Sequence, residues 1–344
     1  MKNRARLRAN NKFIFKPEYV TIFIIIFILG LSAIYKPELF IEAVRRREFF
    51  QSIILGLPLI VTVAMGMMMV ITTGCIDVSV GSIVGFTGMF VGFLFKFYDA
   101  PFWVGVLAAI VVGMMAGAFN GLFISYFRIN FLVVTLATMN IWRGLAFVIT
   151  DGVEIGASYM PEQMSFLILK GPIPRIGIPW LIWIALFFVI IMVFFMKYSH
   201  FGREVYAVGG NENAAKLRGI NVKKVKFVVF ALTGMFSGIA GLMYGARFGF
   251  FSPGDTGNGM ELIVIASTVI GGVSISGGRG SIIGVVLGCL LLGTVQTLIP
   301  SVGFSSFYNT TIYGLIIIIA LIIDTGIKIR KSRGVLAKKG VVGD

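Results

Sequence analysis

The chain has 344 residues, of which 57% are hydrophobic and only 13% are charged. A membrane-spanning helix needs about 20 apolar residues, so this composition leaves room for about ten spans and excludes a soluble domain. The net charge of +15 is spread over short segments between apolar stretches. Lys and Arg in such segments mark the cytoplasmic side of a membrane protein, so nucleic-acid binding is not expected.

Ten apolar stretches predict an all-α polytopic membrane protein whose residues 1–344 form a single transmembrane domain. The expected spans are 20–35, 53–73, 80–97, 102–127, 131–150, 178–198, 227–247, 262–273, 282–299 and 311–327. Cys75 and Cys289 are isolated in apolar surroundings, so neither a disulfide framework nor a metal site is predicted.

Basic residues set the predicted orientation. The tails 1–18 and 328–344 and the loop 199–226 are basic, and an even number of spans places all three in the cytoplasm. The first span is predicted to be retained, because no small-residue cleavage site follows it. Arg45, Arg46 and Arg47 then fall on the outer side, against the positive-inside rule.

The longest outer connection, residues 151–179, contains four prolines. Proline interrupts regular helices, so this segment is predicted to form an ordered cap or a re-entrant turn.

The loop 199–226 is the longest polar and basic interval of the chain, and we expect a short helix within it. Gly209 and Gly210 are predicted to break the chain, Asn211 to cap the N-terminus, and Gly219 to follow the C-terminus with positive φ. Ala214, Ala215 and Leu217 would give this helix a small apolar face for docking on a partner protein. A loop that lies on the lipid surface and only fixes topology is an equally good interpretation.

Several glycines recur at four-residue spacing, which lets helices approach closely in lipid. Static packing is favoured over sliding interfaces for any single pair. The pairs and triplets are Gly88 with Gly92, Gly113 with Gly117 and Gly121, Gly234 with Gly238, Gly241 with Gly245, and Gly280 with Gly284 and Gly288.

Polar side chains within the predicted spans are expensive in lipid and indicate function or special packing. Asn120, Asn140 and Arg143 are candidates to line a path for a polyhydroxylated solute. Asp77 and Glu261 could also face such a path, but capping of broken helix ends is the favoured interpretation for these two.

Nothing in the sequence indicates catalysis. The glycine-rich segment 277–281 lacks the GxxxxGK[ST] spacing of a phosphate-binding loop, so the chain is not expected to hydrolyse ATP. No Ser/His/Asp, Cys/His or paired-carboxylate arrangement is evident, and His200 is the only histidine.

Four long segments carry a resemblance to a known family. They are ITTGCIDVSVGSIVGFTG (71–88), RINFLVVTLATMNIWRG (128–144), GREVYAVGGNENAAKLRGINVKKVK (202–226) and TGNGMELIVIASTVIGGVSISGGRGSIIGVVLG (256–288). Together they resemble the permease subunits of ribose-type sugar ABC importers, including those for monosaccharides and autoinducer-2. Cys75, where relatives often have glycine, and the Arg45–Arg47 triplet depart from the family pattern.

The resemblance implies a translocation subunit of the bacterial inner membrane that binds no cofactor itself. Its expected partners are a pair of cytoplasmic ATPases that bind ATP and Mg²⁺, a periplasmic or lipid-anchored sugar-binding protein, and a second permease chain that is identical or different. The residues it assigns to the ATPase-coupling segment are Gly202, Arg203, Ala207, Gly209, Gly210, Asn211, Ala214, Ala215, Leu217 and Gly219.

Two other functions compete with this interpretation. A secondary sugar transporter driven by an ion gradient would work without an ATPase, and a membrane-embedded enzyme would need a catalytic constellation. Neither the solute nor the identity of the second permease chain follows from the sequence.

Overall fold

The structure of the chain is a computed structural model, and it describes residues 48–169, 171–172, 178–301, 303–319 and 321–322, with isolated positions between 22 and 41. The first predicted span, the Arg45–Arg47 triplet and both basic tails lie mostly or wholly outside these described residues.

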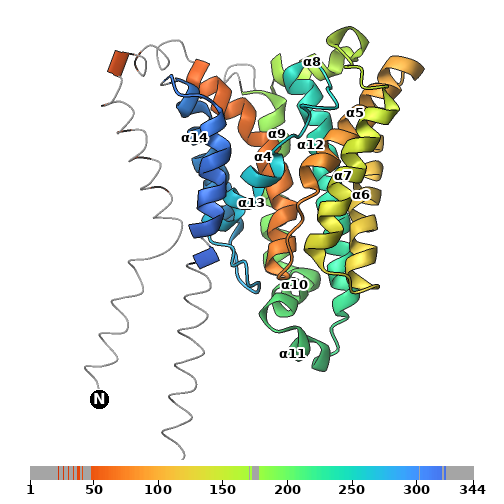
Figure 1. Cartoon of the computed structure of the whole chain (residues 1–344), viewed down its shortest axis with the longest axis vertical. Coiled ribbons are helices and arrows are strands. Elements are labelled where there is room, and N and C mark those ends of the chain that lie inside the picture. The colour runs from red at the N-terminus through yellow and green to blue at the C-terminus, as the bar shows by residue number, and fades with distance from the viewer. Residues whose placement is uncertain are drawn as a thin grey trace, which may run out of the picture.

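The described chain is a helical bundle, which confirms the all-α prediction (Figure 1). Its helices are α4 (Glu48–Thr72), α5 (Val80–Tyr98), α6 (Phe102–Ser125), α7 (Phe131–Ile149), the 3₁₀ helix η1 (Ala157–Tyr159), α8 (Glu162–Leu169), α9 (Trp180–Tyr198), α10 (His200–Gly210), α11 (Glu212–Leu217), α12 (Val222–Phe248), α13 (Met260–Ile270) and α14 (Ile282–Ser301). A further apolar helix covers Phe307–Ile319.

Seven of these helices, α4, α5, α6, α7, α9, α12 and α14, are long and apolar enough to cross a membrane. They correspond to seven of the predicted spans. The predicted spans 262–273 and 311–327 correspond to the shorter helices α13 and Phe307–Ile319. With 11 residues, α13 is about 16 Å long, so it crosses only about half of the hydrocarbon layer.

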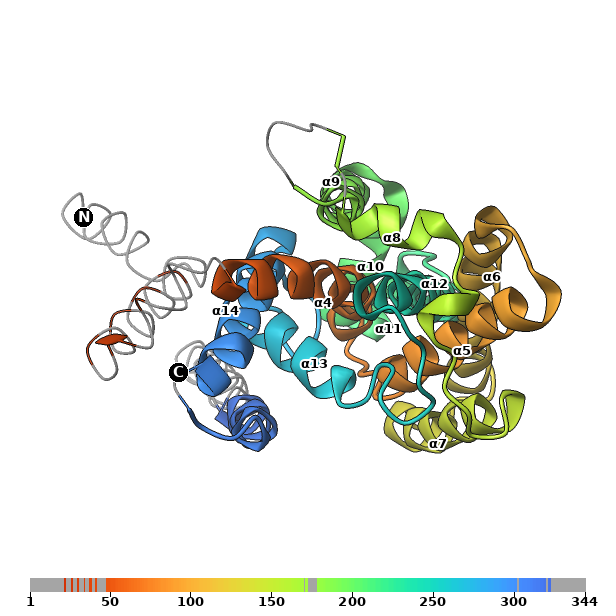
Figure 2. The same cartoon turned by 90° about the horizontal axis from the view of Figure 1, so that it is seen from above.

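α4 and α12 run through the middle of the bundle, with α6 and α7 on one side and α13 and α14 on the other (Figure 2). Glycines bring α6 and α12 together at the level of their backbones. An ideal Cβ at Gly113 would lie 2.8 Å from the Cα of Gly238, and one at Gly117 would lie 2.8 Å from the Cα of Gly234. The predicted close packing of these glycines is therefore confirmed, and the two runs pack against each other.

The connector after α7, predicted to lie on the outer side, is ordered in its described part, as the prolines predict. It forms η1 and α8, at the end of the bundle opposite α10 and α11 (Figure 1). An antiparallel bridge joins Ile155 of this connector to Phe251, which follows α12. The buried ring of Phe251 lies against Gly88, Gly92 and Gly245, where a side chain would collide with it.

Candidate functional site: the α10–α11 element and the helix breaks

α11 is a short helix that is capped at both ends, as predicted. The side chain of Asn211 accepts a hydrogen bond from the backbone N–H of Ala214 at 3.0 Å, and Gly219 has a φ of 79°. Glu212 forms ion pairs with Lys216 at 2.8 Å and with Lys226 at 2.9 Å. Hydrogen bonds from Lys216, which has the larger effect, and from Lys226 lower the pKa of Glu212. This carboxylate therefore stays ionised and holds α11 to the start of α12.

The exposed face of α11 differs from the predicted one. The Leu217 side chain is 90% exposed and Ala214 is exposed, but Ala215 is only 2% exposed. The prediction that Ala215 belongs to the outward docking face is therefore wrong. Positions 214 and 215 point about 100° apart on a helix, so Ala215 packs inward when Ala214 faces out. A charged residue at position 215 would disturb the fold of this chain rather than report on a partner.

The prediction that Gly209 and Gly210 break the chain is also wrong, because both belong to α10. α10 begins after Ser199, whose hydroxyl accepts a hydrogen bond from the N–H of Gly202 at 2.8 Å. It ends at Gly210, and the next residue, Asn211, serves as the N-cap of α11. Glycine is used at position 209 for close approach, since a Cβ there would collide with the carbonyl oxygen of Thr72.

α10 contacts two of the breaks between helices. The hydroxyl of Tyr206 donates to the carbonyl of Gly280 at 3.0 Å, in the loop between α13 and α14. The N–H of Gly278 in the same loop donates to the carbonyl of Thr72 at 2.8 Å, where α4 ends. The end of α4, the α13–α14 loop and α10 therefore meet at one point.

The remaining predicted coupling residues lie along α10. Gly202 is buried against the backbone of Met196, and Ala207 is half-buried. Arg203 is exposed and donates from Nη1 to the carbonyl of Tyr198 at 3.0 Å.

Asp77 lies in the break between α4 and α5, but the N-cap of α5 is Ser79, not Asp77. Its Oδ1 accepts from the backbone N–H of Ser79 at 2.9 Å and from the hydroxyl of Ser79 at 2.6 Å. The amide of Asn120 donates to the same hydroxyl at 2.7 Å. All three side chains are fully or almost fully buried. Asn120 thus faces a packed polar cluster in this conformation, and its role in a solute path stays a prediction.

Arg143 and Glu261 each lie against a glycine of α5, Arg143 against Gly85 and Glu261 against Gly81. Arg143 donates from Nη1 to the carbonyls of Pro253 at 3.0 Å and Thr256 at 2.8 Å, so it anchors the loop that leads into α13. Glu261 lies in the first turn of α13, where an acid is favoured, and its carboxylate contacts Gly81. The N-cap itself is Gly259, not Glu261.

Asn140 is apart from these residues. It is exposed on α7, and its amide donates to the carbonyl of Leu136 in the same helix at 2.9 Å.

A cavity of about 270 Å³ with several polar residues in its lining lies among α4, α12, α13, α14 and the helix Phe307–Ile319. Arg247, Gln296, Asn309 and Tyr313 line it, and none of the three predicted path residues does. Of these four, Gln296 lies well inside a predicted span, 282–299, whereas the other three lie at or just outside predicted span ends. Burial of Asn309 and Tyr313 depends on which helices pack together, which no local pattern reveals.

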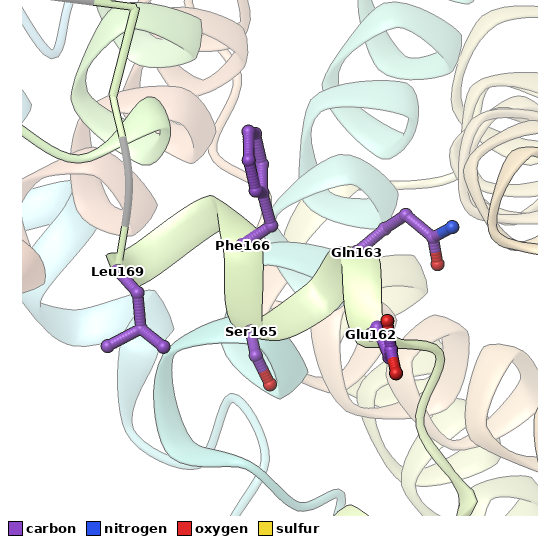
Figure 3. Close-up of a pocket in the computed structure, with 5 residues that line it drawn as sticks. All are labelled: Glu162, Gln163, Ser165, Phe166 and Leu169. Carbon is purple, nitrogen blue, oxygen red and sulfur yellow. The ribbon is translucent and has the colours of Figure 1, made fainter. Parts of the chain in front are cut away.

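A second hollow lies along α8 and is lined by Glu162, Gln163, Ser165, Phe166 and Leu169. Figure 3 shows that these side chains project to different sides of the helix instead of converging on one point. The hollow is therefore a feature of the outer surface and not a site built around a ligand.

Comparison with known proteins gives consistent matches. A family described as "Branched-chain amino acid transport system / permease component" matches residues 49–321. The L-arabinose transport system permease protein of Escherichia coli (strain K12) is 38% identical over 262 residues, which cover 76% of this chain and 78% of that protein. The autoinducer 2 import system permease protein of Escherichia coli (strain K12 / DH10B) is 32% identical over 283 residues, which cover 82% of this chain and 80% of that protein.

A third relative, the L-arabinose ABC transporter permease protein of Azospirillum brasilense, is 36% identical over 274 residues, or 80% of this chain and 79% of that protein. No solved structure matches the chain.

Proposed function

Because this chain belongs to the family of ABC-importer permease components, we propose that it carries a monosaccharide or a sugar-like solute such as autoinducer-2 across the bacterial inner membrane. Relatives that cover about four-fifths of the chain are named for L-arabinose or autoinducer-2. These names favour a sugar-like solute over the branched-chain amino acids of the family description. The ion-gradient alternative has no support among these relatives.

The proposed partners follow from the same family. A pair of cytoplasmic ATPases binds ATP and Mg²⁺ and docks on α11, a binding protein delivers the solute from the outer side, and a second permease chain completes the pore. The chain itself performs no chemistry and needs no cofactor. Both termini are placed in the cytoplasm, on the side of α11.

The main support for this proposal is the position of α10. It lies between the exposed helix α11 and two breaks, one at the end of α4 and one between α13 and α14. Tyr206 and Gly209 of α10 touch the α13–α14 loop and the end of α4. When the ATPases close and move α11, α10 moves with it, because Asn211 joins the two helices without an intervening loop. The displacement then reaches both breaks through direct backbone contacts. Short and interrupted helices of this kind are used in transporters to change access to a central path.

We predict that Leu217→Glu reduces co-purification of the ATPase and ATP-driven uptake by at least about tenfold, because a buried apolar contact of this size is worth about 1.5–3 kcal/mol. The Leu217 side chain is 90% exposed in this chain, so the substitution leaves folding intact. Affinity pull-down of the ATPase and uptake in proteoliposomes that contain the complete importer measure the two effects.

Leu169→Glu is the matched control, because Leu169 is 79% exposed and belongs to α8, which lies at the end of the bundle opposite α11 (Figure 1). It should retain the ATPase. Normal pull-down and uptake with Leu217→Glu would show that α11 is not the docking element.

A further inference from the structure

The cavity lined by Arg247 is hereafter called the Arg247 cavity. It adjoins a second cavity, and the two share several lining residues. The Arg247 cavity has a volume of about 270 Å³, and a neighbouring cavity of about 330 Å³ shares Arg247 and Gln296 with it. The two spaces follow α4 and α14 through the outer half of the bundle. Their size is at the lower end of the range for small-molecule sites.

Two nearly buried polar groups in the Arg247 cavity lack a partner. Asn309 is 7% exposed and Tyr313 is 5% exposed. Within the described part of the chain, neither Oδ1 of Asn309 nor the hydroxyl of Tyr313 has a hydrogen-bond partner. The amide nitrogen of Asn309 contacts the carbonyl of Gln296 at 3.4 Å, which leaves Oδ1 as the free acceptor. Buried polar groups are normally paired. Both atoms have less than 1 Å² of accessible surface, so they would meet a bound molecule once their side chains turn toward the cavity.

The guanidinium of Arg247 lies over the ring of Phe248 at 4.6 Å from its centroid. No carboxylate or carbonyl of the described residues accepts a hydrogen bond from it. Room for the guanidinium comes from Gly56 of α4, where an ideal Cβ would lie 3.0 Å from Nη1. Among the described residues, the contact found for this cation is the ring of Phe248, and a cation at this depth without an acceptor is costly and points to a functional role.

The charges around the cavity define the class of molecule that fits it. Asp255 and Asn258 lie exposed among the lining residues, so one carboxylate balances the one guanidinium. The remaining polar groups are the hydroxyls of four residues, two amides and the N-terminus of α13, whose N-cap Gly259 supplies no side chain. The hydroxyls belong to Tyr244, Ser306, Thr310 and Tyr313. These groups both donate and accept hydrogen bonds. They match a neutral molecule with several hydroxyl groups, whereas an anion would add a charge that the Asp255 carboxylate repels.

We propose that the Arg247 cavity is a low-affinity binding site for a neutral polyhydroxylated solute within a single permease chain. Asn309 and Tyr313 pair with solute hydroxyls there, and Arg247 donates to solute oxygens. This inference rests on the proposed function, which supplies the solute, and adds a site that the ATPase-coupling element does not require.

The test is equilibrium binding of radiolabelled L-arabinose, D-ribose and D-ribose 5-phosphate to the full permease chain in lipid nanodiscs. At least one of the neutral sugars should bind saturably, and D-ribose 5-phosphate should not compete with it. Tyr313→Phe and Asn309→Leu should each weaken binding about tenfold, because each removes one buried hydrogen bond while keeping the shape of the side chain.

Tyr308→Phe is the matched control, because Tyr308 lies on the same helix, is 56% exposed, and does not line the cavity. It should bind like the wild type. Equal binding by all variants, or the absence of saturable binding of either sugar to the wild type, would overturn the proposal.

ATP-driven uptake by the complete importer, measured in parallel, separates the two hypotheses. Unchanged solute binding by both cavity variants, together with normal uptake by the wild type, removes only the Arg247 site. Failure of the wild type to take up any solute with its ATPase and binding protein removes the proposed function itself.

Discussion

Gly209 has no side chain, and this allows α10 to approach the end of α4 closely. A Cβ at this position would meet the carbonyl oxygen of Thr72 and would lie 2.6 Å from the nitrogen of Gly278. Backbone atoms cannot rotate away as a flexible side chain can. Gly210 is the next residue of the same helix, and a Cβ there would meet no atom within 4 Å.

We therefore predict opposite effects of the same substitution at adjacent positions. Gly209→Ala should destabilise the permease by about 1–3 kcal/mol through overpacking and should lower the amount of solute transported per ATP hydrolysed. Gly210→Ala should be neutral or stabilising by up to about 1 kcal/mol, because alanine favours the helix. Thermal stability in detergent and coupled uptake assays measure both. Equal stability of the two variants would contradict a tight contact at Gly209.

At the scale of whole elements, the α6–α12 interface depends on direct contact between two glycine-lined helices. Water does not drive helices together inside a bilayer, so close van der Waals packing must supply the attraction. The sequence predicted such packing from the four-residue spacing, and the structure identifies the partner of each run. Gly144 of α7 provides a contrast, since a Cβ there would meet no atom within 4 Å.

Gly117→Val should lower the thermal stability of the permease by about 1–3 kcal/mol and reduce the yield of folded protein, because its side chain enters the α12 backbone. Gly144→Val, which introduces the same side chain into an exposed helix face, should change the stability little. Fluorescence-detected size-exclusion chromatography after heating compares them. If both variants have the melting temperature of the wild type, the α6–α12 contact is not a source of stability.

At the scale of the whole molecule, α8 and α11 lie at opposite ends of the described bundle, so they should lie on opposite sides of the membrane (Figure 1). A membrane-impermeant maleimide should label Leu217→Cys only from the cytoplasmic side and Leu169→Cys only from the outer side. Both native cysteines, Cys75 and Cys289, are buried, so they contribute little background. Labelling of position 217 in intact spheroplasts from outside would reverse the orientation and exclude ATPase docking on α11.

Hydrophobic stretches were sufficient to predict the helices that cross the bundle, because lipid requires each span to satisfy its own backbone. Local capping chemistry was sufficient for α11, since Asn211 and Gly219 act within one turn of the helix ends. Sequence alone did not reveal α10 as a helix, because Gly209 is chosen for a contact with Thr72 that is distant in the chain. It also did not reveal the Arg247 cavity, whose lining comes from five separate segments.

Phe251 links the connector after α7 to the interior of the bundle. Its backbone pairs with Ile155 in the outer connector, while its ring occupies the notch formed by Gly88, Gly92 and Gly245. The connector cannot rise from the bundle without extracting this ring from between α5 and α12, and the loop that follows Phe251 leads into α13. Phe251 therefore ties the connector to α13 from one side, while Tyr206 of α10 contacts the loop that follows α13 from the other. A displacement that begins at either end of the bundle should thus reach the same half-length helix.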